Sequence, residues 1–176
     1  VQSQIAGVLF TVEPTHGNRA RLFIEAVYGL GEAAVSGEVK PDLYFVHKGD
    51  GSTIRVLKTE VSPQDWQLVR NERATDHEHT NIKVPVPAEK RDAPKLTEKQ
   101  VLELARIGLS IESHYGFPQD IEWALEGGRF YIVQSRPVTT LDKARSALRI
   151  DLTDGEKPLL VGSPASPGAG AGLVKI

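Results

Sequence analysis

Two stretches near the start of the sequence are apolar at almost every position. Residues 5–12 read IAGVLFTV and residues 20–29 read ARLFIEAVYG. Short runs rich in β-branched and aromatic residues predict strands, and their nearly continuous apolar character predicts central strands of a sheet. Pro14, Gly17 and Asn18 predict a turn between the two strands. One face of the second strand is expected to carry Leu22, Ile24, Ala26 and Tyr28.

The middle of the chain has a weaker and more varied pattern. A short apolar stretch with helical spacing follows the sequence GLGE, and Gly37 is suited to end it. Residues 42–48 and 52–60 flank the sequence GDG, which predicts a β-hairpin. Residues 62–95 are polar at first and are then interrupted by three prolines. We therefore expect an excursion there, with one or two short edge strands.

The clearest helical pattern covers residues 97–115. Thr97 is a suitable N-cap, and Gln100 follows three residues later as the partner in a capping box. Gly116 and the proline two residues after it are expected to end the helix. Apolar residues recur at spacings of three and four, which predicts a buried stripe. The stripe consists of Val101, Leu104, Ala105, Gly108, Ile111 and Tyr115.

The stretch DIEWALEGGRFYIVQSRP, residues 120–137, predicts two strands around a glycine turn. Four polar residues interrupt its apolar pattern: Asp120, Glu122, Gln134 and Arg136. Because side chains alternate between the two faces of a strand, Asp120 and Glu122 share one face, and so do the other two. Whether both pairs lie on the same face depends on the length of the glycine loop.

A two-residue glycine loop without a bulge would place Glu122 and Gln134 on opposite faces. In a three-residue loop, residues 126–128, Glu122 instead lies opposite Ile132. Asp120 then lies opposite Gln134, and all four polar groups face one way. The apolar pattern and the use of glycine beside a bulge favour the three-residue loop. In that register the core face carries Ile121, Trp123, Tyr131 and Val133.

A shared face gives the four polar residues a chemical meaning. The Glu122 carboxylate and the Gln134 amide oxygen, one strand apart, are hard oxygen ligands of the kind that Mg²⁺ prefers. Arg136 beside them is suited to clamp a phosphate with paired, charge-assisted hydrogen bonds. A second interpretation is a hairpin with one solvated face, in which Asp120 and Arg136 pair as a minor stabiliser. Spacing alone leaves both interpretations open.

Composition narrows the classes of protein. The chain has 176 residues, a formal net charge of -2 and ordinary shares of apolar and charged residues, so nothing favours binding to nucleic acid or to an acidic membrane surface. It has no cysteine, which fits a reducing compartment, and we expect a cytoplasmic protein. No apolar run has the length of a membrane span. The sequence has no methionine and begins within a predicted strand, which predicts a piece of a larger protein.

Two further motifs have ordinary explanations beside functional ones. His77 and His79 could chelate a metal, but they lie in a polar stretch with no third ligand near them in the sequence. The tract GAGAG, residues 168–172, is rich in glycine like a phosphate-binding loop. It lacks the Lys-Ser/Thr that follows such a loop, and a predicted strand rather than a helix comes after it, so this interpretation fails.

Several segments, in order, resemble one known family. The most specific is HYGFPQDIEWALEGGRFYIVQSRPVT, and upstream of it stand AGVLFTVEP, YGLGEAAVSGEVKPDLYFVHK and LTEKQVLELA. Downstream stands GSPASPGAGAGLVKI. Together they resemble the end of the nucleotide-binding domain of the pyruvate, water dikinases, that is, phosphoenolpyruvate synthases. This wider family includes pyruvate phosphate dikinase and rifampin phosphotransferase. The resemblance covers nearly the whole chain.

The resemblance implies specific roles for the polar residues. By motif, Glu122 and Gln134 match the family's ligands of Mg²⁺-ATP, and Arg136 matches an arginine that contacts the phosphates. Asp120 matches an acidic neighbour in the same site. Glu32, in GLGEAAVSG, lies in a segment that lines the nucleotide site. ATP and Mg²⁺ are thus the expected cofactors.

The resemblance also implies an architecture. We expect an α+β fold, a mostly antiparallel sheet with one packed helix, that is the C-terminal subdomain of an ATP-grasp nucleotide-binding domain (residues 1–139). A linker (140–160) and the truncated start of a swivelling phosphohistidine domain (161–176) would follow. The last strand, 171–176, is expected to be disordered or to pair with an exposed edge, including that of another copy.

The implied reaction belongs to the whole parent enzyme. Phosphoryl would pass from ATP to a histidine on the mobile domain and then to pyruvate, with AMP, phosphate and phosphoenolpyruvate as products. The N-terminal ATP-grasp subdomain, the phosphohistidine and the pyruvate site are not in this sequence, so we expect no such activity from the chain alone. Two alternatives remain: a related dikinase or rifampin phosphotransferase with another acceptor, and a noncatalytic interaction or regulatory module.

Overall fold

The computed structural model describes residues 2–13, 17–49, 53–71 and 80–138. The chain divides into two units, residues 1–138 and 139–176, and the fold presented below is that of the first. The expected linker and terminal strand lie outside the described residues, as do the GAGAG tract and the pair of histidines at 77 and 79.

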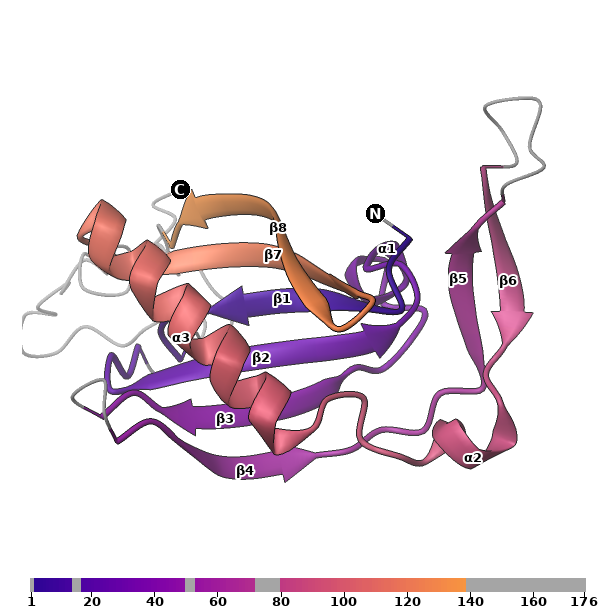
Figure 1. Cartoon of the computed structure of the whole chain (residues 1–176), viewed down its shortest axis with the longest axis horizontal. Coiled ribbons are helices and arrows are strands. Elements are labelled where there is room, and N and C mark those ends of the chain that lie inside the picture. Colours follow the sequence, from indigo (N-terminus) through magenta and orange to yellow (C-terminus); the bar gives the residue numbers. More distant parts are fainter. Residues whose placement is uncertain (1, 14–16, 50–52, 72–79, 139–176) are drawn as a thin grey trace, which may run out of the picture. The chain divides into compact units, whose positions relative to one another are not determined.

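In the described part of the chain, a six-stranded antiparallel sheet forms the body of the fold (Figure 1). Its strand order is β4-β3-β2-β1-β7-β8, and each neighbouring pair is antiparallel. The two strands predicted to be central are central, because the β-branched and aromatic runs that form them are covered on both faces. The strands are β1 (Ile5–Phe10), β2 (Arg21–Tyr28), β3 (Asp42–His47), β4 (Arg55–Glu60), β7 (Gln119–Glu126) and β8 (Arg129–Pro137).

Helix α3 (Glu98–Tyr115) crosses one face of this sheet (Figure 1). The predicted capping box is confirmed: Thr97 Oγ1 accepts from the Gln100 backbone N–H, and Gln100 Oε1 accepts from the Thr97 N–H. Gly116 ends the helix in the left-handed conformation, with φ 77°. No helix among the described residues is long and apolar enough to cross a membrane.

The buried stripe of α3 packs on the apolar side chains of β1, β2, β3 and β7. Val101, Leu104 and Ala105 are fully buried, as predicted. The prediction that Tyr115 is buried is wrong. Its side chain is half exposed because it packs on the rings of His114 and Phe117 rather than on the core.

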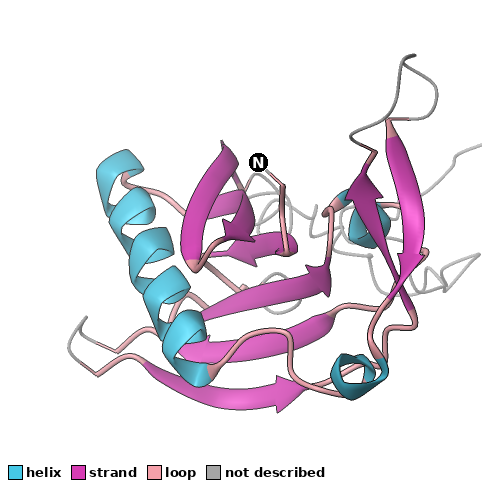
Figure 2. Cartoon of the chain, turned by 45° about the vertical axis from the view of Figure 1, so that its right-hand side comes forward, coloured by secondary structure: helices cyan, strands magenta, loops and turns pink. Residues whose placement is uncertain are grey.

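The segment between β4 and α3 leaves the sheet. Its strands β5 (Trp66–Arg70) and β6 (Asn81–Pro85) pair only with each other, so they form a separate two-stranded sheet rather than the predicted edge strands. Figure 2 shows this ribbon standing apart from the six-stranded sheet. Two short helices flank it in the sequence, α1 (Glu32–Val35) and α2 (Ala88–Arg91). We refer to residues 66–85 as the side hairpin.

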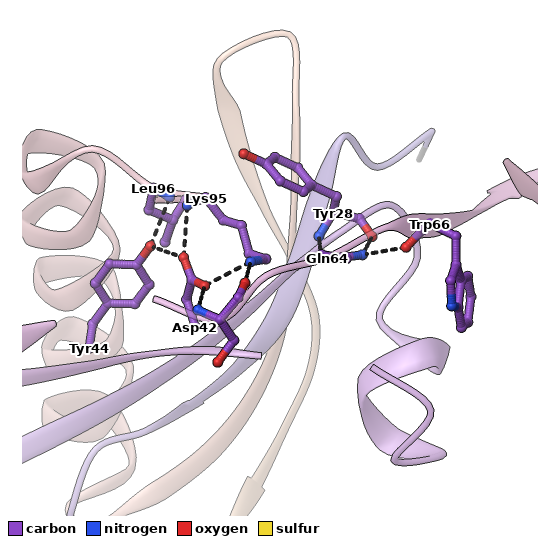
Figure 3. A network of polar contacts seen from close by, with 8 residues as sticks. Tyr28, Asp42, Tyr44, Gln64, Trp66, Lys95 and Leu96 are labelled. Carbon is purple, nitrogen blue, oxygen red and sulfur yellow. Dashed lines mark hydrogen bonds and ion pairs between the residues drawn. The ribbon is translucent and has the colours of Figure 1, made fainter. Parts of the chain in front are cut away.

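A buried ion pair fixes one junction of this excursion (Figure 3). Lys95 Nζ donates to Asp42 Oδ1 at 2.7 Å and to the Ser62 carbonyl at 2.7 Å, and neither charged side chain is exposed. The other Asp42 oxygen accepts from the Tyr44 hydroxyl, and that hydroxyl accepts from the Leu96 N–H. Every charged group in the node is therefore paired, which is the condition for burying an ion pair.

A second polar contact fixes the entry to the side hairpin (Figure 3). The buried Gln64 side chain bonds to both backbone groups of Tyr28: its Oε1 accepts from the N–H at 2.9 Å, and its Nε2 donates to the carbonyl at 3.0 Å. The same Nε2 also donates to the Trp66 carbonyl. The amide thus occupies the place of a strand partner beside β2.

Candidate functional site

The turn between β7 and β8 differs from the predicted one. Glu126 pairs directly with Arg129, so the loop has two residues, Gly127 and Gly128, rather than three. Both glycines have positive φ, 58° and 78°, as a type I′ turn requires, and this turn is the favoured two-residue connection of a hairpin. The predicted three-residue loop is wrong.

A bulge inside β8 restores the alignment of the polar residues. Trp123 pairs with Ile132, but Glu122 pairs with Gln134, so Val133 is the extra residue. From that point the two strands stay in phase, and Asp120 pairs with Arg136. The four polar residues therefore lie on one face, opposite one another in two pairs. The predicted pairings of Glu122 with Ile132 and Asp120 with Gln134 are wrong, since they assumed a bulge at the loop.

The two-residue loop also reverses the facing of residues at the start of β8. Ile121 and Trp123 lie in the core as predicted, but Phe130 contacts them there in place of Tyr131. The prediction that Val133 faces the core is wrong as well, and its side chain is 62% exposed. A bulge commonly redirects a side chain next to a functional site.

The polar residues occupy the face of the sheet that α3 does not cover. Arg136 Nε donates to Asp120 Oδ2 at 2.8 Å, and this hydrogen bond raises the pKa of the guanidinium. The other oxygen, Asp120 Oδ1, is buried and has no hydrogen-bond partner in the described part of the chain. Among the same residues, neither the Glu122 carboxylate nor the Gln134 amide has a side-chain partner. A buried acceptor without a donor costs about 1–3 kcal/mol, so this corner favours a bound cation or donor.

Glu25 is a site residue that the sequence analysis missed. It lies on β2 opposite Val8, and Val8 in turn lies opposite Glu122, so both carboxylates flank one β1 residue on the same face. Burial, and then the charge of Asp120, raise the pKa of the Glu25 carboxyl. The signal was present in the sequence, because an acidic residue interrupts the continuous apolar run LFIEAVY.

Beside these carboxylates lies a cleft with a volume of about 790 Å³. It extends from Glu25 and Glu122 past the small residues of β1 to α1 and the side hairpin. Glu32 lines the same cleft, and its Oε2 accepts from Asn81 Nδ2 at 2.9 Å. Of the predicted site residues, Glu122 and Glu32 therefore line the cleft. Asp120, Gln134 and Arg136 lie next to Glu122 on the hairpin but outside the cleft lining.

The donor set fits a hard divalent cation that brings ligands of its own. Glu122, Gln134 and the unpaired oxygen of Asp120 are oxygen donors on neighbouring strands, and Glu25 adds negative charge beside them. Mg²⁺ typically takes one or two protein carboxylates and completes its shell with water or phosphate oxygens. The described residues contain no group of three or more His, Cys, Asp or Glu side chains that could hold a metal by themselves.

Comparisons with known proteins agree with one another. Residues 1–155 match the family model described as pyruvate phosphate dikinase, AMP/ATP-binding domain. The whole chain is 42% identical to a probable phosphoenolpyruvate synthase of Methanocaldococcus jannaschii and 41% identical to the phosphoenolpyruvate synthase of Pyrococcus furiosus. It covers 14% and 22% of those proteins. Over 78% of its length it is 43% identical to a rifampicin phosphotransferase of Bacillus subtilis, and it covers 15% of that protein. The chain thus spans less than a quarter of each of these relatives.

Proposed function

The chain belongs to the family of pyruvate phosphate dikinase AMP/ATP-binding domains, and from that premise we propose that it supplies one half of an Mg²⁺-ATP site. The observation that carries the proposal is the pairing of Glu122 with Gln134 and of Asp120 with Arg136 on one sheet face, beside a cleft of about 790 Å³. A merely solvated hairpin face has no need of a buried, unpaired carboxylate oxygen.

Each residue has a role in this proposal. Glu122 and Gln134 hold the cation that accompanies the nucleotide, and Asp120 keeps the Arg136 guanidinium extended along the strand. Arg136 is 56% exposed, so its remaining N–H groups are free to donate to a phosphate. When bound, Mg²⁺ neutralises and bridges phosphate oxygens. Glu25 loses its proton more readily once a cation is present, since its raised pKa reflects burial and neighbouring negative charge.

The larger setting is part of the proposal. The fold is interpreted as the C-terminal subdomain of an ATP-grasp domain within a longer cytoplasmic enzyme, and the relatives' greater length supports this. An N-terminal subdomain would close over the nucleotide, and a histidine of a mobile domain would receive a phosphoryl group. The overall reaction would convert ATP, pyruvate and water into AMP, phosphate and phosphoenolpyruvate. The chain alone is expected to be inactive.

One observation favours a second candidate. The identity to the rifampicin phosphotransferase is as high as to the phosphoenolpyruvate synthases, although it covers less of the chain. In that case the ATP site is the same and only the acceptor differs. A noncatalytic module is disfavoured, because it would not need the oxygen donors of β7 and β8 to lie open beside a cleft.

The test uses the full-length protein with ATP, Mg²⁺ and either pyruvate or rifampicin. Product analysis identifies the acceptor, because phosphoenolpyruvate forms only with the first and a phosphorylated antibiotic only with the second. Glu122→Gln is expected to lower turnover by about 100-fold or more, as loss of a transition-state contact does. The matched control is Glu103→Gln on the exposed surface of α3, expected to change it less than twofold. Undiminished turnover in Glu122→Gln would refute the proposed site.

A further inference from the structure

We propose that Arg70, on the side hairpin, is a further ligand-binding residue of the cleft and that it contacts the nucleoside part of the nucleotide rather than its phosphates. This inference rests on the proposed function. It concerns a segment whose sequence pattern is weak and whose strands lie outside the six-stranded sheet. It starts from one observation: Arg70, Thr80 and Asn81 line the same cleft as Glu122.

The side hairpin is fastened to the cleft. The Leu30 N–H donates to the Leu68 carbonyl at 2.8 Å, and Gly29 and Leu68 form an isolated bridge. Trp66 and Leu68 pack with the buried side chains of α1 and β2. At the far end, Asn81 donates to Glu32. The hairpin is therefore held at both its entry and its exit beside α1.

This placement aims Arg70 at the cleft. Side chains two residues apart on a strand share a face, so Arg70 lies on the face of Leu68 that packs against α1. Arg70 is the last residue of β5 and pairs with Asn81, so it extends beyond that packing. Its guanidinium is exposed and makes no hydrogen bond or ion pair with any described residue. An arginine held at a cleft without an acidic partner is available to a ligand.

The rows of the sheet indicate which part of the ligand Arg70 meets. Asp120 and Phe10 form one row, Glu122 and Val8 the next, and Ala124 and Ala6 the third. Successive rows lie about 7 Å apart along the strands. Gly31 follows the third row, since a Cβ placed on it would lie 3.6 Å from Ala6 Cβ. The cleft thus extends from the cation donors at one end to α1 and the side hairpin at the other.

The chemistry of the two ends differs. The carboxylates at the strand end suit a cation with phosphates, as proposed above, so the nucleoside is expected at the hairpin end. That end is lined by Leu30, Ala34 and Val35, and Val35 is 75% exposed, an apolar surface for a planar base. A guanidinium stacks on aromatic rings and donates to ring nitrogen or carbonyl acceptors. Glu32, oriented by Asn81, is placed to accept from sugar hydroxyls.

The experiment measures binding of adenosine, AMP and ATP with Mg²⁺ to the full-length protein by calorimetric or competition titration. Arg70→Gln is expected to weaken all three by the same factor, about tenfold, because the lost contact is to the part that they share. The matched control is Arg106→Gln on the exposed surface of α3, which is expected to change none of them.

Three results would overturn the inference or its basis, and they are distinguishable. Unchanged affinities in Arg70→Gln would show that the side chain does not touch the ligand. A loss that is absent for adenosine and increases with each phosphate would place Arg70 on the phosphates. If the wild-type protein binds none of the ligands, the proposed function itself fails. Arg70→Lys, which keeps the charge but not the planar fork, is expected to lie between wild type and Arg70→Gln.

Discussion

The chain contains two antiparallel ribbons that border the same cleft, and they are stabilised in different ways. The β7–β8 hairpin is part of the six-stranded sheet, and α3 covers its apolar face. The side hairpin pairs only with itself and is held by a few anchors, chiefly Gln64, Lys95 and the packing of Trp66 and Leu68. The comparison indicates that one wall of the site is set by the sheet and the other by long-range polar contacts.

The largest effect on this comparison is expected from the buried ion pair. Lys95→Met leaves the Asp42 carboxylate buried without its cation, and breaking such a pair typically costs about 3–5 kcal/mol. Urea unfolding of the chain should therefore show a loss of that size. The exposed pair of Lys58 with Glu60 provides the control, and Lys58→Met should change the free energy of unfolding by less than about 1 kcal/mol. Equal effects of the two substitutions would contradict the assigned role of the node.

A smaller and more local effect is expected at the hairpin entry. Gln64→Ala leaves the Tyr28 N–H and carbonyl without their side-chain partner, which costs about 1–3 kcal/mol for a buried group. Hydrogen exchange should become faster in β5 and β6 while the amides of β7 and β8 keep their protection. Gln67→Ala, on the same hairpin, is the matched control. A uniform loss of protection in both ribbons would show that the side hairpin is not separately anchored.

The sequence pattern predicted the β7–β8 ribbon in all but its register. Alternation identified the polar face and the strands, because β-branched and aromatic residues there serve a half-buried sheet. The position of the bulge was not predictable, since nothing local distinguishes Val133 from Ile132 as the extra residue. It is determined by which of the two fits against Trp123 and the core. Two opposite errors, in the loop and in the bulge, left the four polar residues on a common face.

The side hairpin was predicted only as short strands because its stabilising contacts are not local. Gln64 bonds to a residue 36 positions away, and Lys95 to one 53 positions away. No periodicity carries such a contact. Its apolar anchor is formed chiefly by Trp66 and Leu68, which is too short for a strong pattern. Arg70 therefore had no sequence signal as a cleft residue, whereas Glu25 had one that was overlooked.

The central claim is that Glu122 on β7 and Gln134 on β8 hold the same cation. A double-mutant cycle tests it by measuring the Mg²⁺ dependence of ATP binding in the full-length protein with Glu122→Gln, Gln134→Ala and both. Each single substitution is expected to weaken Mg²⁺-dependent binding about tenfold. The double variant should lose far less than the product of the two factors, because residues that share one ligand are energetically coupled. Strictly multiplicative losses, or an Mg²⁺ dependence that neither substitution changes, would contradict the claim.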